Sequence, residues 1–252
     1  DDDAATGEWT TASNWDPDGV PGADSEAVFT STGTSGSPVI TLASDQTIDQ
    51  LTISTSNPFT IGSTGGHSLT LTHVVKDVAG GIHTIAAPIA LAADSTWDIA
   101  GTNPWNHLVY VDGGISGTGM NFTKEGEGRL YFNSANTYTG TTTVKAGTLT
   151  LSAPSGQVIS GNLVIGGYGA EATVNSSGNN SIKISNSANV TVKDQGAFTS
   201  PSNDTIGSLT VEAGGVVYVN YLFLSTPNIT MTGGEIYLYQ GRIYSSTSGL
   251  TV

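Results

Sequence analysis

Seven positive side chains are the candidates for polysaccharide lyase chemistry. That reaction needs a general base and cations that neutralise a uronate carboxylate. Only two pairs lie close in sequence, Lys124 with Arg129 and Lys183 with Lys193. Lys183 and Lys193 occupy outward positions of strand-like alternation, so we expect solvated strand faces there. The full set is Lys76, Lys124, Arg129, Lys145, Lys183, Lys193 and Arg242.

Glycoside hydrolase chemistry needs two carboxylates about 5–10 Å apart. Two candidate pairs, Asp45 with Asp49 and Asp94 with Asp98, are each four residues apart. Asp98 lies between Trp97 and Ile99, so we expect its side chain to point outward. Surface or turn positions explain both pairs more simply than a catalytic site does.

Histidines and acidic residues offer no clear metal site. His73 and His83 could face one another across a coil, but no third ligand stands at a clear spacing. Asp16-Pro17-Asp18-Gly19 resembles the start of a calcium loop, yet the twelfth position is Ala27, with Glu26 one residue short. Since phosphate-loop, dinucleotide and nucleophile-elbow motifs are also missing, we expect no metal, no cofactor and no catalytic residues.

Aromatic residues offer another route to binding. Tyr237 and Tyr239 flank Leu238, which we expect to point inward, so the two tyrosines share a face. Exposed aromatics of this kind contact glycans or proteins. We take Trp105, Tyr237 and Tyr239 as candidate glycan or interface residues; a role in the core is the alternative. The wider set is Trp97, Trp105, Tyr110, Tyr218, Tyr221, Tyr237, Tyr239 and Tyr244.

The composition narrows the class of protein. The 252 residues carry a net charge of −14, only 11% are charged, and there is no cysteine. A helical bundle, a nucleic-acid binder and a disulfide scaffold are therefore excluded. No apolar run reaches about 18 residues, so no membrane-spanning helix is expected. The chain begins with Asp1 and shows no targeting segment, so any signal peptide has been removed or left out.

Short apolar alternation indicates an all-β fold. Triplets such as Leu51-Thr52-Ile53 and Leu149-Thr150-Leu151 put their apolar members on one face of a strand. Similar triplets recur after 18 to 20 residues: from Leu51 to Leu69, from Leu130 to Leu149, from Leu163 to Ile182 and from Val190 to Leu209. That period is typical of a β-solenoid with coils of about 19 residues, roughly twelve in this chain. An antiparallel sandwich is the alternative, but hairpin dipeptides are scarce.

Two segments resemble known bacterial surface proteins. Residues 120–151 contain Lys124-x-Gly126-x-Gly128, Ala135-Asn136-x-Tyr138-x-Gly140 and Ala146-Gly147-Thr148-Leu149. This segment resembles the autotransporter-associated β-strand repeat, also called the passenger-associated transport repeat. The start of the chain, with Trp9, Trp15 and Gly19-Val20-Pro21, is similar to the N-terminal part of proteins that carry such repeats.

The resemblance implies an exported right-handed parallel β-helix without catalytic residues. We expect an N-terminal cap over 1–28 and a solenoid over 29–252. The expected function is an extracellular, cell-surface, non-enzymatic structural or adhesive protein. Self-association through the solenoid ends would give fibres, because strand edges at the ends can pair with another chain. A polysaccharide-binding module, or a lyase or hydrolase on the same scaffold, is the alternative; nucleic acid is not an expected partner.

Overall fold

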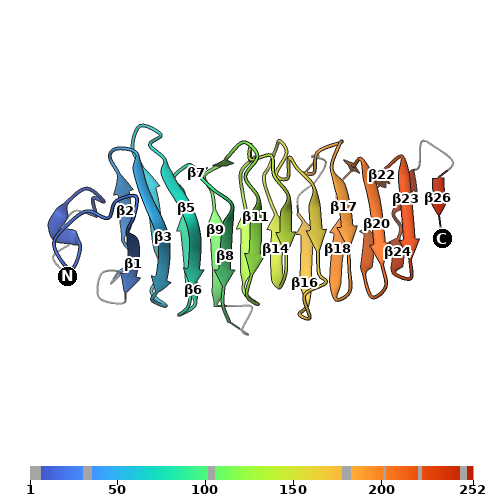
Figure 1. Ribbon diagram of the computed structural model, residues 1–252, viewed down its shortest axis with the longest axis horizontal. Helices are drawn as coiled ribbons and strands as arrows, with labels where there is room; N and C mark the ends of the chain where they lie inside the picture. Colours follow the sequence, from blue (N-terminus) through green and yellow to red (C-terminus); the bar gives the residue numbers. More distant parts are fainter. Residues whose placement is uncertain are drawn as a thin grey trace.

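The computed structural model describes residues 7–30, 36–101, 106–177, 183–200, 203–220, 223–244 and 249–251. The chain forms an elongated parallel β-solenoid with its first and last strands at opposite ends (Figure 1). Every pairing between named strands is parallel, which confirms the predicted all-β solenoid and excludes the antiparallel sandwich. The 3-10 turn η1 (Ala12–Asn14) is the helical element of these residues.

Two long sheets run along the molecule, and a short third sheet is formed by strands between residues 204 and 244. Sheet 1 has 13 strands: β1 (Glu26–Thr30), β3 (Gln46–Ser54), β5 (Leu69–Asp77), β7 (Ile89–Leu91), β8 (Ser95–Ile99), β10 (Ile115–Ser116), β11 (Phe122–Glu125), β13 (Thr142–Val144), β15 (Leu163–Ile165), β17 (Asn189–Val192), β20 (Ser208–Glu212), β23 (Asn228–Thr232) and β26 (Gly249–Thr251). Sheet 2 has 10: β2 (Val39–Leu42), β4 (Phe59–Ser63), β6 (Gly81–Ile85), β9 (His107–Val111), β12 (Arg129–Phe132), β14 (Gly147–Leu151), β16 (Ala172–Ser176), β18 (Gly196–Ser200), β21 (Val216–Asn220) and β24 (Glu235–Tyr239). Sheet 3 comprises β19 (Asp204–Thr205), β22 (Phe223–Ser225) and β25 (Arg242–Tyr244).

The coils are longer and less regular than the sequence predicts. They number about nine with a spacing near 21 residues, rather than twelve of 19. Leu130 pairs with Leu149, as predicted. Leu163 pairs with Val190 instead of Ile182, because this coil contains 27 residues. Leu51 pairs with Val75 rather than Leu69. In β5 one extra residue lies within the strand, where the register with β3 shifts between Ile48 and Gln50. Elsewhere the extra residues lie between strands, so the paired strands keep their register while the coil length varies.

The core is a column of inward side chains between the sheets. Alternation buries every second residue, as in β8 and β16, whose side chains follow a strict buried-intermediate pattern. Large aromatic side chains fill the N-terminal part, where Phe29 stacks on Phe59 with ring centroids 4.8 Å apart. Trp9 packs edge-on against Trp15 at 4.9 Å, and Trp9 is fully buried. Burial of such side chains is the main stabilising contribution available to this narrow fold.

The segment before β1 covers one sheet only. The main-chain N–H of Trp9 donates to the Thr41 carbonyl at 2.9 Å, and Glu8 forms a parallel bridge with Thr41 of β2. Sheet 1 begins with β1. The N-terminal segment thus adds a short rung to sheet 2 and none to sheet 1 within the described residues.

Candidate functional site

The segment that resembles a passenger repeat forms complete rungs of sheets 1 and 2, from β11 to β14. The apolar residues that the sequence places inward are all buried: Leu130, Phe132, Tyr138, Val144, Leu149 and Leu151. Gly126 turns the corner with φ of +71°, and a Cβ there would lie 2.3 Å from the Ile99 carbonyl oxygen. Only glycine fits this position, because both the backbone angle and the close approach exclude a side chain.

Lys124 points into the core rather than into solvent. Its register partners in sheet 1 are Trp97 and Val144, and its side chain is fully buried. The ammonium donates to the carbonyls of Glu125 at 2.7 Å, Gly126 at 2.6 Å and Ala146 at 3.2 Å. Burial lowers the pKa of Lys124 to about 7, an effect that the nearby carboxylates of Asp98 and Glu125 oppose. This lysine therefore ties the Gly126 corner to the next coil, and a substrate cannot reach it.

Lys183 corrects the expectation of a solvated strand face. Its side chain is fully buried and donates to the Ala153 carbonyl, while its main-chain N–H donates to Asp204 Oδ1 at 2.7 Å. Burial lowers the pKa of Lys183, with Asp204 opposing the change. Lys193 is half-buried. The two lysines hence lack the shared exposed face that binding of a uronate would need.

Asn136 links three consecutive coils through its side chain. Its Oδ1 accepts the N–H of Ile115 at 2.8 Å, and its Nδ2 donates to the Val158 carbonyl at 3.0 Å. The Tyr138 hydroxyl bonds Thr142 Oγ1 at 2.6 Å, and burial raises the pKa of that phenol. Both side chains are buried polar groups with partners, so the repeat motif is built around internal hydrogen bonds.

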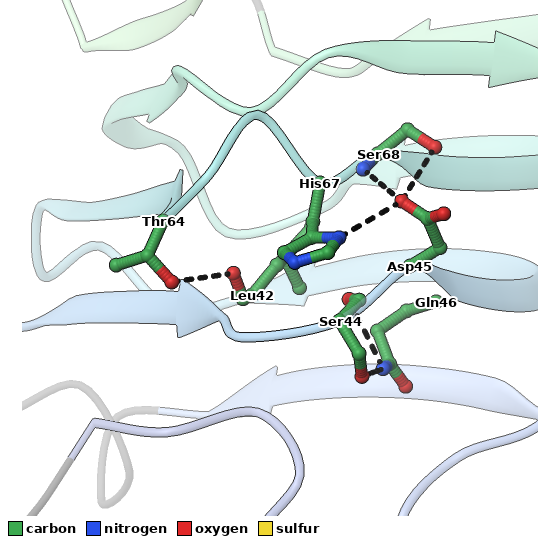
Figure 2. Close-up of polar contacts among 7 residues, drawn as sticks. All are labelled: Leu42, Ser44, Asp45, Gln46, Thr64, His67 and Ser68. Atoms are coloured by element: carbon green, nitrogen blue, oxygen red, sulfur yellow. Dashed lines mark hydrogen bonds and ion pairs between the residues drawn. The ribbon is translucent and has the colours of Figure 1, made fainter.

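The exposed acidic and histidine side chains cap corners between coils. Figure 2 shows Asp45 between His67 and Ser68, with His67 Nδ1 at 3.4 Å and the Ser68 N–H at 2.8 Å from Asp45 Oδ1. The Ser68 hydroxyl also donates to Asp45 Oδ1, at 3.3 Å. A catalytic serine would instead donate to the imidazole. The cluster is therefore a corner cap, in which one carboxylate holds the next coil.

The carboxylate pairs considered for hydrolysis share this role. The N–H of Ser68 lowers the pKa of Asp45, the Thr72 hydroxyl lowers that of Asp49, and the N–H of Asn121 lowers that of Asp94. A general acid at neutral pH needs the opposite change. Asp98 is half-buried between the buried Trp97 and Ile99, as its alternation predicts.

A second group of titratable side chains lies inside the solenoid. Asp77 and His83 are fully buried, and Asp77 Oδ2 lies 3.9 Å from His107 Nδ1. Asp77 Oδ1 accepts the Gly80 N–H at 3.0 Å, and His83 Nε2 lies 3.1 Å from the Gly80 carbonyl. Burial raises the pKa of Asp77 and lowers that of His83. Both side chains are thus shifted toward their neutral forms. In the residues that the structure describes, no group of three His, Cys, Asp or Glu is arranged to hold a metal ion.

Tyrosines gather in one outward column of sheet 2, which we call the tyrosine column. Tyr110 stacks on Tyr131 with centroids 4.7 Å apart, and Tyr218 stacks on Tyr237 at 5.4 Å. Small polar residues separate the two pairs. In register order the column contains Thr84, Tyr110, Tyr131, Thr150, Asn175, Thr199, Tyr218 and Tyr237. The sequence does not predict this alignment, because the intervening coils differ in length.

The aromatic residues considered for binding differ in their exposure to solvent. Tyr237 and Tyr239 are exposed, with 49% and 59% of their surface accessible. Leu238 is on the inward face, as expected, because it follows the buried Val219 in register. It is nevertheless 55% exposed, because β24 is the last strand of sheet 2 in the described part of the chain. Trp97 is a core residue and not part of a binding surface. Trp105 and Tyr221 lie outside the described residues.

One comparison with known proteins supports the resemblance of this segment to a passenger repeat. The family model of the passenger-associated-transport-repeat matches residues 122–151. No curated protein and no solved structure matches the chain. Within its described part, the chain has no helix of the length and hydrophobicity that a bilayer crossing requires.

Proposed function

We propose that this chain is a structural section of a bacterial surface or secreted protein, a passenger-type β-solenoid that carries an adhesive outer face. The observation that carries the proposal is the repeat at residues 122–151, which matches the passenger-associated transport repeat and forms rungs continuous with the coils on both sides. A repeat of this kind contributes a section of a long rod.

The chemistry of the ionisable groups supports a non-enzymatic role. The exposed carboxylates Asp45, Asp49 and Asp94 hold hydrogen bonds between coils and have lowered pKa values. Burial lowers the pKa of Lys124 and raises the pKa of Asp77, which brings both closer to neutral pH, but both side chains are fully buried. Catalysis needs a perturbed group that can reach a substrate.

Surface labelling in the source cells tests the location. Intact cells should react with an antibody against the chain, and added protease should remove the signal. A signal that appears only after permeabilisation would contradict the proposal. Activity screens on uronate polymers and neutral glycans test the enzymatic alternative, since release of product would show catalysis.

Glycan binding is a second candidate function, favoured by the exposed tyrosines of sheet 2. Tyr237 stacks on Tyr218, lies on β24 at the end of sheet 2, and is 49% exposed. A glycan array should show binding that Tyr237→Ala weakens and Tyr168→Ala leaves unchanged. Tyr168 is a suitable control because it is equally exposed and outside the tyrosine column.

Self-association into fibres is the third element of the proposal. At the sheet ends, β1, β26 and β24 each have a side on which no described strand pairs, and such edges pair with other chains. Electron microscopy of the concentrated chain should show filaments. Short rods of uniform length at every concentration would contradict head-to-tail assembly.

A further inference from the structure

A cavity of about 750 Å³ lies between the N-terminal segment and the first strand of sheet 1. Its apolar wall includes Trp15 and Phe29, and its polar wall includes Glu8, Asp16, Asp18 and Glu26. Cavities of this volume are typical of ligand sites, which combine apolar area with a few polar groups. The proposed surface role does not account for it.

One side of the cavity is the outer edge of the strand that begins sheet 1. β1 is the terminal strand of sheet 1 and pairs with β3 on its inner side. The N-terminal segment makes its main-chain bonds with β2 instead, through Thr41. Among the described residues no strand covers the outer side of β1. An exposed edge of this type binds an extended peptide by adding it as a further strand.

The charge of the lining selects a basic ligand. The cavity is lined by four carboxylates and by no lysine or arginine, and the first 75 residues of the chain contain neither. A metal ion is an unsuitable occupant, because these acids are not arranged as a metal-binding group in the described part of the chain. The complementary ligand is therefore an organic cation.

We propose that this cavity binds a short basic peptide segment in an extended conformation. The peptide main chain pairs with the outer edge of β1. Its apolar side chains pack near Trp15 and Phe29, and its lysine or arginine side chains lie against Asp16, Asp18 and Glu8. A strand fits this site better than a compact cation, because residues of β1 and the acidic side chains line the same cavity.

Peptide binding to the full chain tests the proposal. The probe is a fluorescein-labelled peptide of alternating lysine and valine, followed by fluorescence anisotropy at low and high salt. Matched peptides replace lysine by glutamate, or carry N-methyl groups on alternate amides, which block strand pairing. Hydrogen exchange of the β1 amides reports where the peptide binds.

The lysine peptide should bind saturably, more weakly at high salt, and should slow exchange of the β1 amides. The double variant Asp16→Asn with Asp18→Asn should bind it roughly fivefold more weakly, since two exposed ion pairs are lost. Asp24→Asn should bind normally, because Asp24 is in the same loop but does not line the cavity. Equal binding of the glutamate or N-methylated peptide, protection elsewhere, or no binding would overturn the proposal. Equal competition by N-acetyl-lysine amide would show a site for a small cation instead, which also overturns it.

Discussion

Asn136 accepts a hydrogen bond from the main-chain N–H of Ile115, at 2.8 Å and 21 residues earlier in the chain. The same carboxamide donates to the Val158 carbonyl, 22 residues later. One side chain thus joins three coils in the interior. Because this buried carboxamide satisfies main-chain groups of both neighbouring coils, the position has a large effect on stability.

Asn136→Leu should lower the free energy of unfolding by about 2–5 kcal/mol, because it keeps the volume and leaves two buried main-chain groups without partners. Denaturant unfolding of the full chain measures this change. Asn133→Ala is the matched control, since the Asn133 side chain bonds Asp112 at the surface at 2.7 Å. Its effect should stay below about 0.5 kcal/mol. Equal effects of the two variants would contradict a special role for Asn136.

Lys124 should make stability rise with pH. Its pKa is about 7 in the folded chain, compared with 10.5 for an ordinary lysine, so between these values the unfolded chain binds more protons. Unfolding free energy then increases by up to about 1.4 kcal/mol per pH unit, until the ordinary pKa is reached. Stability should be measured between about pH 7 and pH 9.5, below the titration of Tyr138. Because burial raises the pKa of Tyr138, its titration lowers the free energy of unfolding as pH rises further.

Lys124→Met should therefore flatten this pH dependence. Lys145→Met is the control, because Lys145 is partly exposed and pairs with Glu125 at 2.7 Å. Its slope should match that of the unchanged chain. An unchanged slope in Lys124→Met would show that the ammonium stays charged throughout this range, held by its three carbonyl partners.

Asp77→Asn should stabilise the chain at neutral pH. Burial raises the folded pKa of Asp77, so its favourable contribution is complete below the ordinary value of 3.8 and is lost as pH rises through the folded pKa. Asparagine keeps an acceptor for the Gly80 N–H and carries no charge. The expected gain at pH 7 is on the order of 1 kcal/mol, with none at acidic pH where the aspartate is protonated. Thermal unfolding at the two pH values measures it; a loss of stability at pH 7 would indicate an ion pair with a histidine.

Tyr218 and Tyr237 should stabilise each other by about 0.5–1.5 kcal/mol through stacking. A double-mutant cycle with Tyr218→Ala and Tyr237→Ala measures this coupling energy directly. Tyr168→Ala combined with Tyr237→Ala provides the control, and additive effects are expected there. Additivity in the stacked pair as well would show that these exposed rings do not stabilise the end of sheet 2.

The sequence predicts the architecture well where coils are uniform. Leu130 with Leu149, and Val190 with Leu209, are paired as the 19-residue spacing predicts. The prediction for Leu163 is wrong because its coil is 27 residues long, and periodicity cannot locate extra residues at a corner. A register derived from spacing fails whenever corner length changes.

Buried polar residues were the other source of error. Lys183 is buried, although we expected it on a solvated strand face. Strand alternation also places Lys124 with Phe122, and Asp77 with Val75, on inward faces, where charged side chains are not normally expected. These charged side chains are buried because main-chain carbonyl and N–H groups at the corners form hydrogen bonds with them. The direction of those main-chain groups is not evident from the alternation of apolar and polar residues. The tyrosine column was missed for a related reason, since it depends on the register of eight separate strands.

Because coil length varies, residues inserted at a corner and substitutions within a strand have different consequences for the fold. A corner can gain or lose residues while the strands above and below keep their hydrogen bonds, as they do between β15 and β17. Mutations that lengthen a corner therefore create new surface at small thermodynamic cost, whereas substitutions along the rungs are constrained by both neighbours. Such a rod can diversify what it presents to its surroundings and retain the same mechanical axis.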